Sequence, residues 1–102
     1  MKLEFYSQEK LKKEVVKIIA KYLDLNCYQV FFFGSRVKSD NFLRSDIDIG
    51  IEGPEEIPPA IKVEIQEQID KLPTLYKFDL VDFKNVAADF KKQALKHVEY
   101  LK

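Results

Sequence analysis

One segment, FFFGSRVKSDNFLRSDIDIGIEG at residues 31–53, constrains the fold more than any other part of this chain. An apolar and aromatic run ends abruptly at Gly34, and Asp46 and Asp48 later alternate with isoleucines. Aromatic and β-branched residues favour strands, and glycine permits a sharp turn. The segment therefore predicts a strand, a tight turn, a short connection and a second strand.

The alternation in the second strand decides which side chains share a face. Successive residues of a strand point to opposite faces, so we expect Asp46 and Asp48 on one face and the isoleucines on the other. The isoleucine face requires a hydrophobic core. The two carboxylates repel each other unless a cation lies between them. Ligands that are all oxygen favour magnesium or manganese over zinc.

A third strand is predicted at residues 76–83, YKFDLVDF. If its apolar residues face the core, Asp79 points to the same side as the first two aspartates. Asp82 is the alternative third carboxylate. It is three residues from Asp79 and so points to the opposite face, and it stands where the strand ends. We therefore expect catalytic and metal-binding roles for Asp46, Asp48 and Asp79.

Apolar residues at helical spacing predict helices before, between and after these strands. Ser7 is a suitable N-cap for the first helix, and Pro73 ends the second. The predicted order is α-β-(α)-β-α-β-α, an α/β fold in which helices cover a three-stranded mixed sheet. The predicted elements are helices at 7–23, 59–72 and 86–101, a helical turn within 36–43, and strands at 28–33, 46–52 and 76–83.

The turn at Gly34 and Ser35 is a candidate phosphate-binding site. Backbone at a glycine can approach a ligand closely, and the amides exposed at such a turn bind phosphate oxygens. The hydroxyl of Ser35 adds a further donor, while Arg36 either contacts a phosphate or is an ordinary solvated side chain. Three nearby carboxylates can hold two magnesium ions about 3.5–4 Å apart, an arrangement suited to in-line displacement at phosphorus.

Composition limits the class of protein and of partner. The chain has 102 residues, which predicts one domain spanning 1–102. Its 17 basic and 17 acidic residues cancel, so we expect no general nucleic-acid surface and no direct DNA binding. We also expect no membrane span, no signal peptide and a cytoplasmic location. With one cysteine, Cys27, an internal disulfide is excluded, and we expect Cys27 to be a small packed side chain.

The combined motif resembles the minimal nucleotidyltransferases of the polymerase-β-like superfamily. That family carries Gly-Ser, a short spacer, Asp-x-Asp and a third aspartate in a hydrophobic strand. In this chain Gly34-Ser35, Asp46-Ile47-Asp48 and Asp79 match the pattern, and the tail FKKQALKHVEYLK looks like the closing helix of the family. The resemblance implies the nucleotidyltransferase fold, ATP as substrate and two Mg²⁺ ions held by the three aspartates.

The resemblance further implies a protein partner. Such proteins are commonly encoded beside a helical HEPN-domain protein that resembles an RNase toxin. They act as its antitoxin by adding AMP from ATP to one of its tyrosines. This chain departs from the family pattern at Val37 and Ser39, where a small alanine and a glycine are common.

Two alternatives stay open from the sequence. The first is a weakly active or inactive relative that neutralises a HEPN partner by contact alone. The second is a fragment of an Asp-x-Asp glycosyltransferase that uses a nucleotide sugar, although such enzymes need a much larger doubly wound domain. The sequence does not determine the oligomeric state, which includes the choice between a homo- and a hetero-oligomer.

Overall fold

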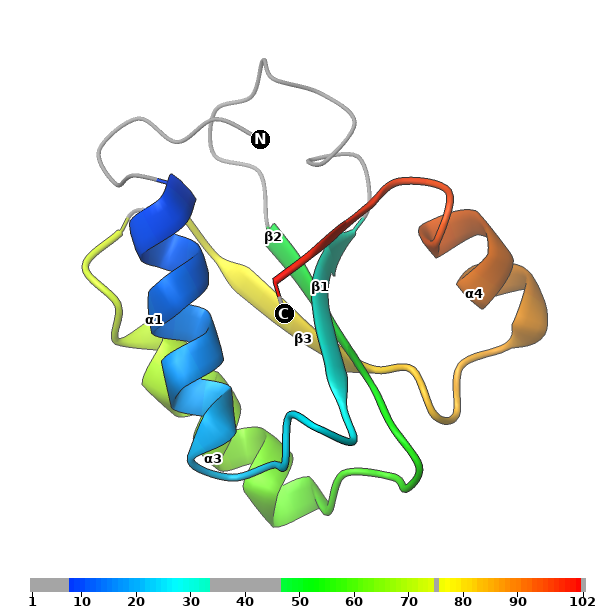
Figure 1. The fold of residues 1–102 in the computed structure, drawn as a ribbon, viewed down its shortest axis with the longest axis horizontal. Coiled ribbons are helices and arrows are strands. Elements are labelled where there is room, and N and C mark those ends of the chain that lie inside the picture. Colours follow the sequence, from blue (N-terminus) through cyan, green and yellow to red (C-terminus); the bar gives the residue numbers. More distant parts are fainter. Residues whose placement is uncertain (1–7, 34–46, 75, 102) are drawn as a thin grey trace.

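The computed structural model describes residues 8–33, 47–74 and 76–101. Several predicted features lie outside these residues, namely the N-cap Ser7, the turn at Gly34 and Ser35, the helical turn within 36–43 and Asp46 at the start of the second predicted strand. The described elements, coloured along the chain in Figure 1, are α1 (Gln8–Ala20), β1 (Gln29–Phe33), β2 (Ile47–Glu52), α3 (Pro59–Asp70), β3 (Phe78–Asp82), α4 (Ala88–Ala94) and β4 (Val98–Tyr100).

The four strands form a mixed sheet with the order β3-β2-β1-β4. β1 is antiparallel to both β2 and β4, whereas β2 and β3 are parallel and are connected through α3. A parallel pair requires a crossover connection, which is usually a helix. Figure 1 shows α1 and α3 on one side of the sheet and α4 on the other. The predicted α/β fold with a mixed sheet is confirmed, and the structure adds a fourth strand.

The larger hydrophobic core lies between the sheet and the helices α1 and α3. Ile47, Ile49 and Ile51 of β2 are fully buried there, so the predicted isoleucine face is confirmed. Complete burial of such a side chain stabilises the folded state by about 1.5–3 kcal/mol. The other buried members come from the helices, the neighbouring strands and the loop before α3: Leu11, Val15, Ile18, Ile19, Val30, Phe32, Ile57, Ile65, Ile69, Phe78 and Leu80.

A smaller hydrophobic core lies on the opposite face of the sheet, beneath α4. Phe31, Phe33, Phe83 and Ala94 are buried in it. The ring of Phe83 stands edge-on to the rings of Phe31 and Phe33, with 5.0 Å between centroids in each pair. Edge-to-face pairs of this kind stabilise beyond the burial of their area. The aspartate face of the sheet is therefore partly covered by apolar side chains.

The C-terminal segment differs from the helix predicted at 86–101. Helix α4 ends at Ala94, and β4 then pairs with β1. The segment also has the alternation of a strand, because Glu99 stands between two residues that favour strands. The edge of β1 offers hydrogen-bonding groups, and the Leu101 N–H donates to the Val30 carbonyl oxygen at 2.8 Å. The predicted closing helix is therefore wrong over its second half, since pairing with a distant strand edge outweighs local helical spacing.

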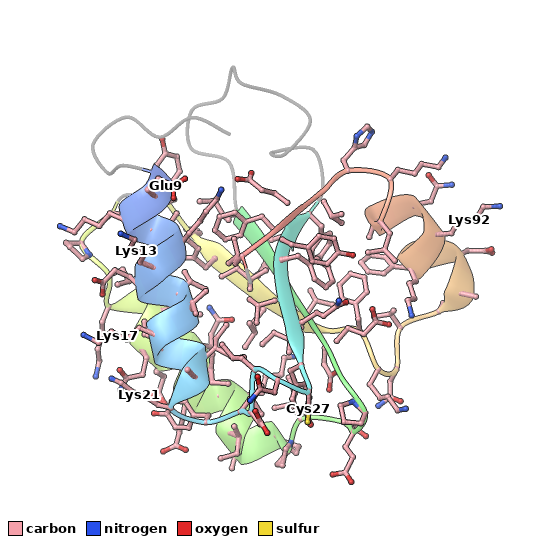
Figure 2. The ribbon with its side chains drawn as sticks, viewed as in Figure 1. Glu9, Lys13, Lys17, Lys21, Cys27 and Lys92 are labelled. Atoms are coloured by element: carbon pink, nitrogen blue, oxygen red, sulfur yellow. The ribbon has the colours of Figure 1, made fainter. Side chains whose placement is uncertain are left out.

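Charged side chains cover the outer side of α1. Lys13 and Lys17 on this helix, and Lys21 in the turn just after it, are exposed and follow one another away from the sheet (Figure 2). Cys27 is exposed as well, in the turn before β1, with its sulfur 3.7 Å from Asp24 Oδ2. The prediction of a packed cysteine is wrong because the turn places this residue at the surface. None of the helices in the described part of the chain is both long and apolar enough to span a membrane.

Candidate active site

Two of the three predicted carboxylates lie side by side on adjacent strands. Asp48 of β2 and Asp79 of β3 are partners in the parallel register, and neighbouring strands lie about 4.8 Å apart. Residues that are level in neighbouring strands project to the same face, so both carboxylates lie on the face opposite the isoleucine core. Asp79 is exposed and Asp48 is half-buried. This placement agrees with the parity argument made from the sequence for Asp79.

Asp48 also lies beside the end of β1. Its antiparallel partner is Phe33, whose ring packs against Phe83 and Phe90 with centroid distances of 5.0 and 6.1 Å. Phe33 is the last residue of β1, so the chain leaves that strand next to Asp48. The predicted phosphate-binding residues follow Phe33 directly in the sequence.

Four predicted site residues fall outside the described part of the chain, namely Gly34, Ser35, Arg36 and Asp46. Their roles stay predictions from the sequence. Within the described residues, no group of three or more His, Cys, Asp or Glu side chains could hold a metal ion. The described site thus consists of two carboxylates, and the predicted third directly precedes β2 in the sequence.

The donor chemistry of this pair fits a hard divalent cation. Asp48 and Asp79 offer carboxylate oxygens, which suit magnesium and manganese better than zinc. Magnesium usually binds through one or two carboxylates and keeps water or substrate phosphates as its other ligands. The exposure of Asp79 leaves its carboxylate accessible to such ligands.

Asp82, the alternative third carboxylate, is engaged elsewhere. Its Oδ2 accepts a hydrogen bond from the Ile57 N–H at 2.8 Å, and its Oδ1 accepts one from the Lys84 N–H at 3.0 Å. These bonds hold the loop before α3 and the turn after β3. Such contacts favour Asp79 over Asp82 as the third ligand, and this assignment stays a prediction.

The structure adds an ion pair that sequence reasoning missed. Lys91 of α4 contacts the carboxylate of Glu52, at the end of β2. Glu52 lies on the same face as Asp48, because the two are four residues apart in one strand. The pair helps to hold α4 on the aspartate face, although its partial exposure limits its contribution to below about 1 kcal/mol. No local pattern signals it, since 39 positions separate the partners.

Comparison with known proteins identifies the wider group to which this architecture is similar. The family described as polymerase beta, nucleotidyltransferase matches residues 9–102. Among curated proteins, none matches the chain.

Solved structures share the fold at low sequence identity. A chain from the complex of a tri-AMPylated Shewanella oneidensis HEPN toxin with MNT antitoxin is 17% identical, with a TM-score of 0.73, over 94% of this chain and 72% of that one. A chain from a toxin–antitoxin structure with AMP-PNP is 18% identical, with a TM-score of 0.74, over 89% and 72%. A chain from the MntA–HepT toxin–antitoxin structure is 17% identical, with a TM-score of 0.72, over 93% and 72%.

Proposed function

This chain belongs to the polymerase-β nucleotidyltransferase family, and we propose that it transfers AMP from ATP to a hydroxyl group of a partner protein. The acceptor we propose is a tyrosine of a HEPN-domain protein, for which the chain acts as antitoxin. The observation that carries the proposal is the register that sets Asp48 beside Asp79 on one sheet face. The likeness to a chain from the complex of a tri-AMPylated HEPN toxin with MNT antitoxin supports the choice of partner. The likeness to a chain from a toxin–antitoxin structure with AMP-PNP supports the choice of nucleotide.

Each predicted site residue has a role in this proposal. Asp46, Asp48 and Asp79 hold two magnesium ions. Gly34 and Ser35 bind phosphate oxygens through backbone amides and the hydroxyl, and Arg36 contacts a phosphate. Bound at the carboxylates, the ions would neutralise charge on the triphosphate and lower the pKa of the attacking hydroxyl. The protein itself contributes chiefly positioning and electrostatic complementarity, as is general for phosphoryl transfer.

The proposed reaction exchanges one oxygen–phosphorus bond for another. The tyrosine oxygen forms a bond to the α-phosphorus of ATP, and the bond from that phosphorus to the bridging oxygen breaks. Pyrophosphate leaves with the electron pair, and the hydroxyl proton passes to a carboxylate of the site. The exposure of Asp79 supports this reading, because an acceptor on another protein must reach the reacting phosphorus.

The second candidate function is neutralisation of the partner by contact without nucleotide transfer. Val37 and Ser39 favour it, because at these positions the sequence departs from the pattern of the minimal nucleotidyltransferases it resembles, in which a small alanine and a glycine are common. Both candidate functions require a complex with the partner, and only nucleotide transfer requires the aspartates.

Thermal unfolding with and without magnesium ATP tests the nucleotide-transfer proposal. A ligand present at 100 times its Kd stabilises the folded state by about 2.7 kcal/mol, so we expect a higher melting temperature with magnesium ATP than with either component alone. Asp46→Asn and Asp48→Asn should each remove most of the shift, because they weaken the metal site.

The matched control is Glu64→Gln, which neutralises an exposed carboxylate on α3 and should leave the shift intact. A wild-type protein that shows no shift with any nucleoside triphosphate and magnesium or manganese would contradict nucleotide transfer. An equal loss of the shift in the Glu64 variant would indicate that the shift depends on the overall charge of the protein and not on the metal site.

A further inference from the structure

Strand β3, which carries Asp79, lies at the edge of the described sheet. Its backbone groups alternate between the neighbouring strand and the open side. The Lys77 carbonyl accepts a hydrogen bond from the Ile47 N–H at 2.7 Å, and the Phe83 N–H donates to the Ile51 carbonyl at 2.8 Å. The backbone N–H and C=O groups of the odd-numbered residues of β3 therefore point towards β2. The backbone groups of the even-numbered residues on either side of Asp79 point away from β2.

The side chain of Gln66 on α3 satisfies two of these outward groups. Its Nε2 donates to the Phe78 carbonyl oxygen at 2.8 Å, and its Oε1 accepts from the Leu80 N–H at 3.2 Å. One primary amide thus makes the two bonds that a further strand would make at this edge. Phe78 and Leu80 are the residues immediately before and after Asp79, so the two bonds bracket that aspartate.

Helix α3 in turn holds the amide of Gln66 in place. Nε2 also donates to Asp70 Oδ1 at 3.0 Å, one helical turn further along α3. Only one orientation of the amide supplies a donor to the Phe78 carbonyl and an acceptor to the Leu80 N–H. The neighbouring residues Ile65 and Ile69 are fully buried and anchor α3 against the sheet.

We propose that Gln66 is a positioning residue for Asp79: its amide holds the β3 backbone on both sides of this aspartate and so keeps the carboxylate level with Asp48. The inference rests on the proposed function, in which both carboxylates hold metal. An edge strand lacks the second neighbour that restrains a central strand, and Gln66 takes the place of that neighbour. Supporting groups behind metal ligands commonly change metal affinity about 10–100-fold when they are removed.

The test compares Gln66→Leu with Gln68→Leu, the same substitution two positions along α3. Two residues correspond to about 200° around a helix, so residue 68 lies on another face. The first readout is amide hydrogen exchange by NMR, without nucleotide. We expect the Leu80 amide to exchange about tenfold faster or more in Gln66→Leu, while the Phe83 amide, which is bonded to β2, stays protected.

The second readout is the affinity for manganese ATP, measured by calorimetry. We expect Gln66→Leu to bind about tenfold more weakly than wild type and Gln68→Leu to bind like wild type. Equal affinities of wild type and Gln66→Leu, in spite of a deprotected Leu80 amide, would overturn the positioning role. An unchanged Leu80 exchange rate would show that Gln66 does not hold the β3 backbone around Asp79.

Two further outcomes of the test are a variant that does not fold and a wild type that does not bind manganese ATP. If Gln66→Leu fails to fold, Gln66→Asn replaces it, because asparagine retains the amide but is too short to reach both backbone groups. We expect the same loss of Leu80 amide protection and the same loss of affinity for manganese ATP. If wild type binds no manganese ATP, the proposed function fails, and the exchange measurement alone decides whether Gln66 holds the backbone at Asp79. The two failures are therefore distinguishable.

Discussion

Gly50 shows how one residue permits the aromatic packing beside the candidate site. It lies on β2 midway between Asp48 and Glu52 on the same face. A Cβ at this position would stand 2.3 Å from Phe31 Cε2 and 2.8 Å from Phe83 Cε1. Both rings are buried, so they have little room to move. The absence of a side chain therefore lets the two phenylalanines lie directly on the strand.

Replacement of Gly50 by alanine is expected to destabilise the protein. Overpacking of a well-packed core costs about 1–3 kcal/mol, and urea denaturation measures the change in the free energy of unfolding. A free energy of unfolding in Gly50→Ala equal to that of wild type would contradict the argument from buried rings.

The raised pKa of the Tyr28 hydroxyl predicts that the folded state loses stability at alkaline pH. Burial, and then the negative charges of Glu55 and Asp82, raise the pKa of its hydroxyl above the ordinary value of about 10. The hydroxyl also donates to the Glu55 carbonyl at 3.2 Å. Because the folded state keeps this proton longer, the unfolded chain loses its proton first as the pH rises through 10. The contribution of Tyr28 is complete below that pH and is lost above it.

Tyr28→Phe removes this titration while it keeps the ring. We expect the free energy of unfolding to fall more steeply in wild type than in the variant between about pH 9 and pH 11, one unit on each side of the ordinary tyrosine pKa. Urea denaturation at several pH values measures both slopes, and titrations of other groups are common to the two proteins. Parallel slopes would show that the pKa of Tyr28 does not change on folding.

At the scale of elements, β4 is attached to the sheet through few bonds. It has three residues and pairs with β1 alone among the described strands. The Leu101 N–H, just beyond the strand, bonds to the Val30 carbonyl. An ion pair between Lys12 of α1 and Glu99 of β4 adds a contact across the same edge. The C-terminal strand thus connects the edge of the sheet to α1.

Comparison of Leu101→Pro with Leu101→Ala tests this attachment. Both variants lose the leucine side chain, and only proline removes the N–H that bonds to Val30. We expect Leu101→Pro to be less stable than Leu101→Ala by about 1 kcal/mol, the net contribution of such a bond. Thermal or urea unfolding measures the difference. Equal stabilities would indicate that the bond contributes nothing in solution.

At the scale of the whole molecule, the sheet separates two hydrophobic cores of different size. The core beneath α1 and α3 holds the isoleucines of β2, and the core beneath α4 holds the phenylalanine rings. The pair Asp48 and Asp79 lies on the α4 side, and Asp79 is exposed. A partner can thus approach these carboxylates while both cores stay packed.

The double variant Asp48→Asn and Asp79→Asn separates nucleotide transfer from neutralisation by contact. We expect it to bind the proposed HEPN-domain partner as tightly as wild type, since neither core is altered. Mass spectrometry of the partner after incubation with magnesium ATP should show added AMP with wild type and none with the variant. Full neutralisation of the partner by the variant would instead favour contact alone.

Much of this architecture could be predicted from short-range pattern. The alternation around Asp48 predicted a buried isoleucine face, and the parity of YKFDLVDF placed Asp79 on the side of Asp48, as the register now shows. Helices α1 and α3 and the three longer strands lie within the predicted ranges. Such features follow from sequence because side-chain direction repeats with the period of the element itself.

Other features depended on contacts between distant segments. The C-terminal segment forms β4 because β1 has an open edge with which it pairs. The spacing of apolar residues within the segment does not indicate this pairing. The same is true of Lys91 with Glu52 and of Gln66 with the backbone around Asp79, whose partners meet only after the sheet has formed. The sequence by itself determined which residues share a face, since that is a property of one element. The tertiary structure alone decided which elements become neighbours, because hydrogen bonds and ion pairs form wherever packing brings complementary groups together.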